Sequence, residues 1–281
     1  MKKIGFVDYY ISEWHANNYP AWIKNACEKL GVELEVGYAW AEEYVSPVDG
    51  RNTDEWCAEF GVEKCETLED LCEKADYILV LSPSNPEKHL EYAKTVLKYK
   101  KNTYIDKTFA PDYATAKKIF DIAEEYGTSF FSSSALRYAS ELDSAIGTSN
   151  AIITGGGLRI EEYIIHQIEM LVKLIGEKPL SVTVTKQEEE KFVCAVEFEN
   201  GKSGGMVYAN DLPFAFHYEK TTDMTAYSLV ESDFFAALLT DIVRFFGDGV
   251  PSFDTKQTLN AINIREGVIK GLDSLGQKIL L

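Results

Sequence analysis

Short apolar runs alternate with amphipathic stretches along the first half of the chain. Several runs are apolar throughout, which is typical of parallel strands covered on both faces. Five of them predict strands: Ile4–Val7, Glu33–Tyr38, Tyr77–Leu81, Thr103–Ile105 and Ser129–Phe131. The stretches between them have apolar residues at helical spacing and predict helices: Pro20–Leu30, Leu68–Lys74, Glu87–Tyr99 and Tyr113–Tyr126. This alternation predicts a doubly wound α/β domain with a parallel sheet.

The pattern changes after about Ser134. A helix is expected over Glu161–Ile175, and three alternating stretches with hairpin spacing follow it: Ser181–Thr185, Phe192–Phe198 and Gly204–Ala209. Their spacing favours an antiparallel or mixed sheet. Two further helices, at Asp233–Gly247 and Thr258–Gly271, close the chain. We therefore expect two domains: residues 1–134, and a smaller α+β domain over residues 135–281 with a mostly antiparallel sheet and its last helices near the junction.

The charge limits the possible partners. The 281 residues include 45 acidic and 28 basic side chains, a net charge of −17. Such a field repels phosphate backbones and anionic lipids, so we expect no nucleic acid and no membrane partner. The five cysteines form no CxxC pair, the opening segment is too short for a signal peptide, and no apolar run could cross a bilayer. These features favour a cytoplasmic protein with free thiols. The four histidines are scattered, so no metal site is expected.

Three short motifs lie at the ends of predicted elements. Residues 82–85, Ser-Pro-Ser-Asn, follow one apolar strand, and residues 106–108, Asp-Lys-Thr, follow the next. Glu162 and His166 lie one turn apart on the predicted helix. In this order the motifs resemble the Gfo/Idh/MocA family (glucose–fructose oxidoreductase / inositol dehydrogenase), which has a Pro-Asn loop, a Glu-Lys-Pro strand end and an Asp-x-x-x-His helix.

The resemblance implies a Rossmann-like first domain and hydride transfer between NAD or NADP and a sugar, polyol or related small hydroxylated substrate. Within it, Lys107 polarises the substrate oxygen and His166, oriented by Glu162, takes the hydroxyl proton. It also implies contacts to cofactor and substrate: Ser82, Pro83, Asn85 and Asp106 beside the cofactor, and Arg137 and Tyr138 beside the substrate. Because members of this family pair through the second-domain sheet, it implies a homo-oligomer.

Structural alternatives stay open for each of these residues. Lys107 could be a surface lysine paired with Asp106 or Asp112, although its place at the carboxyl edge of the sheet suits a ligand. Glu162 and His166 could be an exposed pair on a solvated helix. His89, which follows the Pro-Asn loop, is expected to face solvent. Arg137 could belong to a surface ion pair.

The first loop departs from the family. A dinucleotide-binding loop has glycines at three positions, where this chain has Asp8, Tyr10 and Glu13. A carboxylate about 4 Å from a phosphate is unfavourable by roughly 4 kcal/mol at an effective dielectric constant of about 20. Asp8 and Tyr10 could still line a cofactor, or the loop could have re-formed around its own contacts. Two functions therefore remain: an NAD(P)-dependent oxidoreductase, or a catalytically inactive relative that binds or senses a small molecule.

Overall fold

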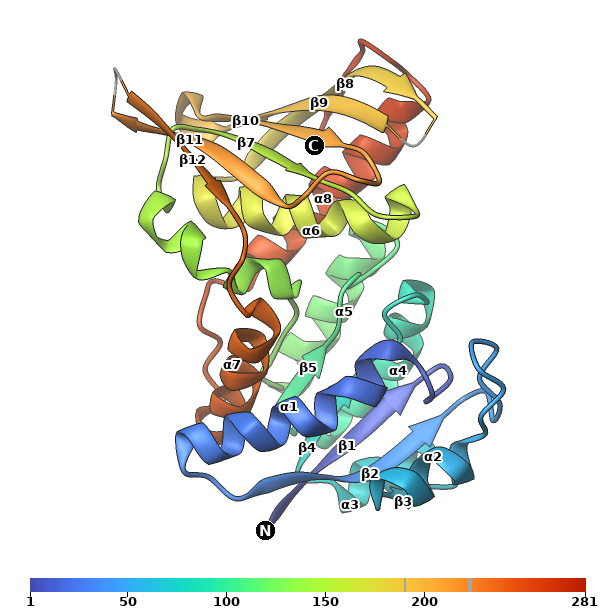
Figure 1. The fold of residues 1–281 in the computed structure, drawn as a ribbon. Coiled ribbons are helices and arrows are strands. Elements are labelled where there is room, and N and C mark those ends of the chain that lie inside the picture. Colours follow the sequence, from blue (N-terminus) through green and yellow to red (C-terminus); the bar gives the residue numbers. More distant parts are fainter. Residues whose placement is uncertain (190, 222–223) are drawn as a thin grey trace. The chain divides into compact units, whose positions relative to one another are not determined.

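The computed structural model describes residues 1–189, 191–221 and 224–281. It divides into two compact units (Figure 1). The first unit comprises residues 1–133 and 235–254, and the second comprises residues 134–234 and 255–281. Residues 235–254 therefore return to the first unit, although the chain around them belongs to the second.

The first unit contains a six-stranded, all-parallel sheet with the strand order β3-β2-β1-β4-β5-β6. Its strands are β1 (Lys2–Asp8), β2 (Leu34–Ala41), β3 (Glu63–Lys64), β4 (Tyr77–Val80), β5 (Thr103–Ile105) and β6 (Phe130–Phe131). Its helices are α1 (Trp14–Leu30), α2 (Thr53–Phe60), α3 (Leu68–Lys74), α4 (His89–Val96), α5 (Tyr113–Tyr126) and α7 (Phe234–Asp248), with 3-10 turns η1 (Pro86–Lys88) and η2 (Leu97–Tyr99). The doubly wound parallel sheet expected from the sequence is confirmed.

Helix α7 completes the apolar cover of this sheet. Phe245 meets Phe131 of β6 edge to face at 4.9 Å between ring centroids, and Phe246 stacks on Tyr77 of β4 at 5.0 Å. At the start of α7, Phe235 lies 5.0 Å from the ring of Trp14 on α1. Aromatic pairs at these distances add to the area that each ring buries, so α7 is an integral part of the first unit.

Helix α1 begins at Trp14, six residues before the predicted start at Pro20, so that prediction is wrong. Glu13 takes the N-cap position in an extended conformation, and its side chain accepts the N–H groups of the first turn. A side-chain acceptor there satisfies donors that have no partner within the helix. Pro20 consequently lies inside the helix.

The second unit contains a seven-stranded sheet with the order β12-β11-β7-β10-β9-β8-β13. Its strands are β7 (Asn150–Gly155), β8 (Pro179–Glu188), β9 (Lys191–Phe198), β10 (Ser203–Tyr208), β11 (Ala215–Thr221), β12 (Met224–Leu229) and β13 (Lys278–Leu280). Its helices are α6 (Ile160–Ile175) and α8 (Lys256–Leu272), with 3-10 segments η3 (Ala135–Tyr138), η4 (Ser140–Ala145) and η5 (Glu199–Gly201). Strands β7 and β10 are parallel and the other described pairs are antiparallel, which confirms the mostly antiparallel sheet.

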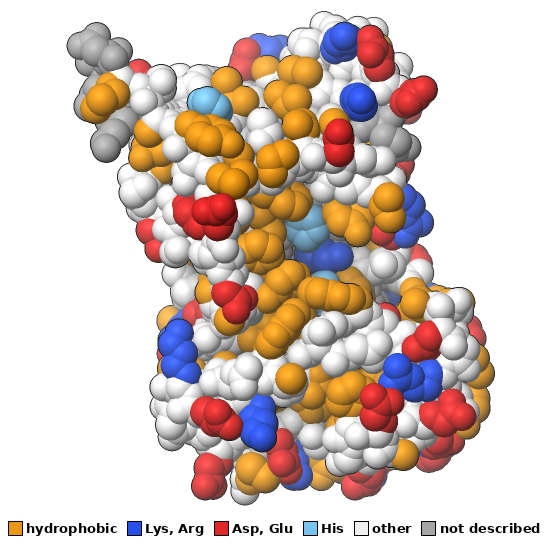
Figure 2. Space-filling view, viewed as in Figure 1, with side chains coloured by type: hydrophobic (Ala, Val, Ile, Leu, Met, Phe, Trp, Pro, Cys, Tyr) orange, Lys and Arg blue, Asp and Glu red, His pale blue; other side chains and the backbone are white. Residues whose placement is uncertain are grey.

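Helices α6 and α8 cover one face of this second sheet, and no helix of the described part of this unit covers the other, open face (Figure 1). Strand β9 shows the difference, since its residues alternate strictly between exposed and buried. The open face carries apolar side chains: Ile152 is 44% exposed, Val193 39% and Tyr227 56%. Figure 2 shows hydrophobic side chains gathered over the strands of this open face. No helix within the described ranges is both long and apolar enough to span a bilayer.

Candidate functional site

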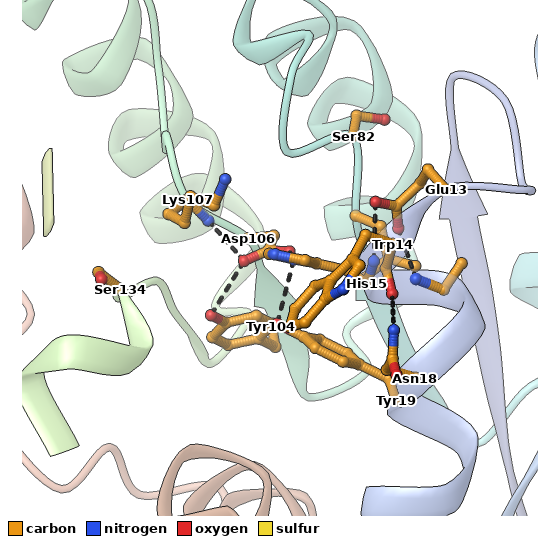
Figure 3. Close-up of polar contacts among 12 residues, drawn as sticks. Glu13, Trp14, His15, Asn18, Tyr19, Ser82, Tyr104, Asp106, Lys107 and Ser134 are labelled. Carbon is orange, nitrogen blue, oxygen red and sulfur yellow. Dashed lines mark hydrogen bonds and ion pairs between the residues drawn. The ribbon is translucent and has the colours of Figure 1, made fainter. Parts of the chain in front are cut away.

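The N-terminus of α1 is the place where a dinucleotide-binding domain holds the pyrophosphate with backbone N–H groups. In this chain a carboxylate already occupies those donors (Figure 3). Glu13 Oε2 accepts the N–H of His15 at 2.8 Å, and Oε1 accepts the N–H of Ala16 at 2.5 Å. Burial raises the pKa of Glu13, although the neighbouring His15 and the two N–H groups favour the ionised form. The chain therefore supplies its own anion to the helix.

Asp8, at the end of β1, is turned into the interior and is 1% exposed. Its Oδ1 accepts the N–H of Tyr9 at 2.7 Å and both the N–H and the hydroxyl of Ser82, at 3.0 and 3.1 Å. Its Oδ2 has no partner within the described part of the chain. Burial, and then the charge of Glu13, raise the pKa of Asp8 well above its ordinary value. Asp8 thus ties the end of β1 to the loop after β4, and it does not point out towards a ligand.

The rest of the loop is held by its own hydrogen bonds. The pairing of β1 with β2 continues past the strands, since the N–H of Glu42 donates to the carbonyl of Asp8 and that of Glu43 to Tyr9, at 3.1 and 2.7 Å. Ser12 donates to Asp49 at 2.7 Å. These contacts support the interpretation that the loop has re-formed. Tyr10 is partly exposed beside Tyr9, with 5.8 Å between ring centroids.

The residues at this edge do not fit a dinucleotide in the usual mode. Glu13 holds the N–H donors that would bind the pyrophosphate. The nearest acidic side chain after β2, where an adenosine ribose is usually bound, is Glu42. It already accepts hydrogen bonds from Lys88 and from the hydroxyl of Tyr92. Both recognition points of the cofactor are therefore occupied by the protein's own groups.

A polar cluster lies beside the re-formed loop, at the carboxyl end of β5 (Figure 3). Asp106 is 1% exposed, and its Oδ2 contacts Nδ1 of His15. Its Oδ1 accepts the N–H of Lys107 at 2.8 Å. The hydroxyl of Tyr19 lies 3.2 Å from the same His15 nitrogen, and the two rings stack. Burial opposes ionisation of Asp106, but His15 and Lys107 lower its pKa, so the cluster holds a buried carboxylate.

Lys107 is half-buried and follows Asp106 at the edge of the sheet. Among the described residues its amine has no ion pair, and Asp112 instead caps α5 through the N–H of Thr115 at 2.7 Å. The surface pair considered as an alternative is therefore not formed. Burial lowers the pKa of Lys107, against the charges of Asp106 and Glu13.

The predicted cofactor residues after β4 divide into two groups. Ser82 and Pro83 are buried, and Ser82 is engaged by Asp8. Asn85 is half-exposed and donates to Glu87 at 3.0 Å.

His89 was expected to face solvent, which is wrong, because it is 0% exposed. Its ring lies between two backbone carbonyls, with Nδ1 3.0 Å from Phe109 O and Nε2 2.6 Å from Leu81 O. Burial lowers its pKa. This histidine joins the start of α4 to two loops and has a structural role.

Glu162 and His166, which the sequence predicted as a pair, each have a different partner in the second unit. His166 Nδ1 lies 2.6 Å from the hydroxyl of Ser134, and Glu162 pairs with Arg159. The ring of His166 also meets those of Tyr163 and Phe214 edge on. Lys107 belongs to the first unit and His166 to the second, so their action on one substrate stays a prediction.

Arg137 is buried, and Tyr138 is partly exposed. The Nε of Arg137 donates to Glu169 at 2.6 Å and its Nη1 to Gln257 at 2.7 Å. The surface ion pair considered for Arg137 is thus a buried one. A buried pair of this kind fixes η3 against α6 and leaves less of the guanidinium for a substrate.

Sequence reasoning missed His15, Tyr19 and Tyr104 as members of the polar cluster. The signal for the first two was their spacing, because residues four apart lie on the same face of a helix. It was hidden by the assignment of residues 14–19 to a loop. The hydroxyl of Tyr104 donates to the carbonyl of Ser133 at 2.8 Å and lies 3.4 Å from Asp106 Oδ1. No local sequence pattern predicts these contacts.

Comparison with known proteins agrees with this fold. Residues 43–134 match the family described as "Oxidoreductase family, NAD-binding Rossmann fold" (GFO_IDH_MocA). A probable dehydrogenase from Thermotoga maritima is similar with a TM-score of 0.78 and 14% identity, over 99% of this chain and 98% of that one. A UDP-N-acetylglucosamine 3-dehydrogenase, GnnA, from Acidithiobacillus ferrooxidans has a TM-score of 0.78 and 12% identity, with 98% and 99% covered. A putative myo-inositol dehydrogenase from Sinorhizobium meliloti 1021 has a TM-score of 0.77 and 10% identity, with 100% and 99% covered. No curated protein sequence matches the chain.

Proposed function

We propose that the protein, whose residues 43–134 match the Gfo/Idh/MocA oxidoreductase family model, binds a small hydroxylated compound without a dinucleotide in the usual position. The observation that carries the proposal is the Glu13 carboxylate on the N–H groups of His15 and Ala16. A sugar or polyol is the substrate class that we favour. The names of two structural relatives, a UDP-N-acetylglucosamine 3-dehydrogenase and a putative myo-inositol dehydrogenase, support that class.

The physical reason is competition for one site. A pyrophosphate at the start of α1 would need the donors that Glu13 holds, and it would approach a buried carboxylate. At about 4 Å and an effective dielectric constant of about 20, that repulsion is roughly 4 kcal/mol. This corresponds to about three tenfold steps in affinity.

A second function is favoured by a different observation. Lys107 presents an amine with no ion pair among the described residues at the carboxyl edge of the parallel sheet, where α/β proteins bind their ligands. The family match adds to this, and together they support an NAD- or NADP-dependent oxidoreductase acting on CH–OH groups, with Lys107 and the pair Glu162 and His166 in the catalytic roles. This function requires Glu13 to leave the start of α1.

Titration of the purified protein with NADH and NADPH separates the two functions. Cofactor fluorescence and thermal shift at low salt report binding directly. We expect no binding up to millimolar cofactor, and a thermal shift with neutral sugars or polyols in the absence of cofactor. Binding at micromolar NADH or NADPH would support the oxidoreductase and refute our first proposal.

We also propose that the protein forms a homo-oligomer through the open face of its second sheet. Ile152, Val193 and Tyr227 expose apolar side chains on that face. Burying such a patch against a second copy removes it from water. Sedimentation should show an oligomer for the wild type and a monomer for Ile152→Lys with Val193→Asp. A folded variant that sediments like the wild type would rule this face out.

Cytoplasmic location stays a prediction. The five cysteines are free and buried.

A further inference from the structure

His15 presents two nitrogens with different surroundings. Nδ1 contacts the Asp106 carboxylate, and the two side chains are 8% and 1% exposed. Within the described ranges Nε2 has no hydrogen bond. It is also absent from the fully buried side-chain atoms of those ranges without a hydrogen-bond partner, such as Asp8 Oδ2. The small exposed part of the side chain therefore includes Nε2. His89, by contrast, has a backbone carbonyl at each nitrogen, as expected of a histidine with a structural role.

The carboxylate determines the chemistry of the open nitrogen. A carboxylate at Nδ1 keeps the ring proton there, leaves the lone pair on Nε2 and makes it a stronger base. Asp106 is itself held, by the N–H of Lys107 at 2.8 Å and the hydroxyl of Tyr104 at 3.4 Å. The stacked ring of Tyr19, 5.0 Å away between centroids, fixes the plane of the imidazole. The arrangement is that of an oriented base.

Lys107, the residue after Asp106, adds a second open group. In the described part of the chain its amine has no hydrogen bond. The amine is not among the fully buried atoms that lack a partner, so solvent reaches it. The negative charges of Asp106 and Glu13 act on it. A protonated amine at such a place donates to an oxygen on which negative charge develops. A base and an oxyanion donor thus lie on neighbouring parts of one sheet edge.

We propose that His15, oriented by Asp106, and Lys107 form a proton-transfer site for a neutral polyhydroxylated carbonyl compound, such as a ketose, an aldose or a keto-polyol. This inference rests on the proposed function, because the sheet edge must be free of dinucleotide. Nε2 takes a proton from the carbon next to the carbonyl, the C–H electron pair forms the C=C bond of an enediolate, and the carbonyl pair moves to the oxygen that faces Lys107. Return of the proton from Nε2 to the same carbon regenerates the substrate. Return to the adjacent carbon, while the proton of the neighbouring hydroxyl moves through Lys107 to the former carbonyl oxygen, shifts the carbonyl by one carbon. The product is an isomer of the substrate, and no oxidant or reductant is consumed.

The charges at this edge favour a neutral substrate over a phosphorylated one. Glu13 blocks the helix N-terminus that would hold a phosphate. The net charge of −17 opposes anionic ligands more generally.

Exchange of carbon-bound hydrogen in D2O tests the proposal without knowledge of the natural substrate. Dihydroxyacetone, D-fructose and 2-keto-myo-inositol serve as probes, followed by proton NMR at pH 8. We expect the wild type to accelerate deuterium incorporation into at least one probe. His15→Gln should reduce the acceleration by about 100-fold or more. Lys107→Met should reduce it as well, whereas Lys24→Met, an exposed lysine on α1, should leave it unchanged.

Asp106 is a positioning residue, so its variants are judged by the separate effects on kcat and KM of exchange. Asp106→Asn removes the carboxylate that holds the ring proton at Nδ1 and should lower kcat with little change in KM, whereas Asp106→Glu should restore part of kcat. No acceleration with any of the three probes, or equal acceleration by His15→Gln, would overturn the proposal. Binding of micromolar NADH would instead refute the proposed function. A protein that ignores NADH and binds a neutral sugar, yet exchanges no hydrogen, refutes only the proton-transfer site.

Discussion

Glu13 is the residue whose replacement discriminates most sharply between a closed and an open phosphate site. Glu13→Gln keeps the size of the side chain and one acceptor oxygen but removes the charge. Glu13→Gly removes the charge and the bulk, and it restores the residue type that a dinucleotide-binding loop has at this position. The backbone tolerates all three residues, because Glu13 is extended with φ −140°.

The expected magnitudes follow from the contacts. Loss of the cap lowers the free energy of unfolding by about 0.5–2 kcal/mol, and by only a few tenths for glycine, so both variants should stay folded. Removing a carboxylate about 4 Å from a phosphate relieves roughly 4 kcal/mol at an effective dielectric constant of about 20. Affinity for a pyrophosphate ligand should therefore rise by up to about three tenfold steps in Glu13→Gly and by less in Glu13→Gln, whose amide still occupies the donors.

Calorimetric titration with ADP, which carries the pyrophosphate, measures this change. An ionic strength of about 0.01 M suits the experiment, because the Debye length is then about 30 Å and the charge effect is retained. Glu33→Gln removes an exposed carboxylate beyond the other end of α1 and is the matched control. If Glu13→Gly remains folded and still binds ADP no better than the wild type, the carboxylate is not what closes the site.

Three further predictions concern stability and are measured by urea unfolding. Asp8 has a raised pKa in the folded protein, so its contribution is favourable at low pH and is lost as the pH rises; Asp8→Asn should be more stable than the wild type at pH 8, with the difference vanishing near pH 3. Arg137→Met removes the guanidinium from the buried Glu169 carboxylate and should cost about 3–5 kcal/mol, so a loss under 1 kcal/mol would contradict a buried pair. Gly156→Ala would place a Cβ 1.8 Å from the carbonyl oxygen of Ala209 and should cost about 1–3 kcal/mol, whereas an unchanged midpoint would mean that the two backbones are not in contact.

Two elements whose ends carry recognisable local sequence signals, α5 and β5, were predicted with their correct bounds. Helix α5 begins after Asp112, whose side chain accepts the N–H of Thr115, and ends at Gly127 in the left-handed region with φ 67°. These are the capping residues that sequence rules recognise. The strand β5 was also placed correctly, because it is a short apolar run between polar loops.

Elements that depend on distant partners were missed. Strand β7 is stabilised by β10 and β11, and its register pairs Ile152 with Gly205 and His217, more than fifty positions later in the chain. No pattern near residue 152 contains that information. Strand propensity is in this sense a property of the neighbours that a segment meets in the sheet.

The candidate site was half predicted for the same reason. Lys107 and Asp106 were found because they follow a recognisable strand. His15 was not, since its partner Asp106 is 91 positions away and its own helix was predicted to begin at Pro20. Glutamate is not among the preferred N-cap residues, so Glu13 gave no sign that the helix starts six residues earlier.

The occupied N–H groups of α1 and the placement of His15 both depend on Glu13. Glu13 caps α1 and thereby fixes its first turn, whose second residue is His15. The imidazole reaches Asp106 from that turn, and Tyr19, one turn further along, supports it. A loop that opens to admit a pyrophosphate would release the cap and the orientation of His15 with it. Phosphate binding and proton transfer should therefore exclude each other, so that ADP bound to Glu13→Gly suppresses its hydrogen exchange. A variant that binds ADP and exchanges hydrogen at an undiminished rate would show that the first turn of α1 does not couple them.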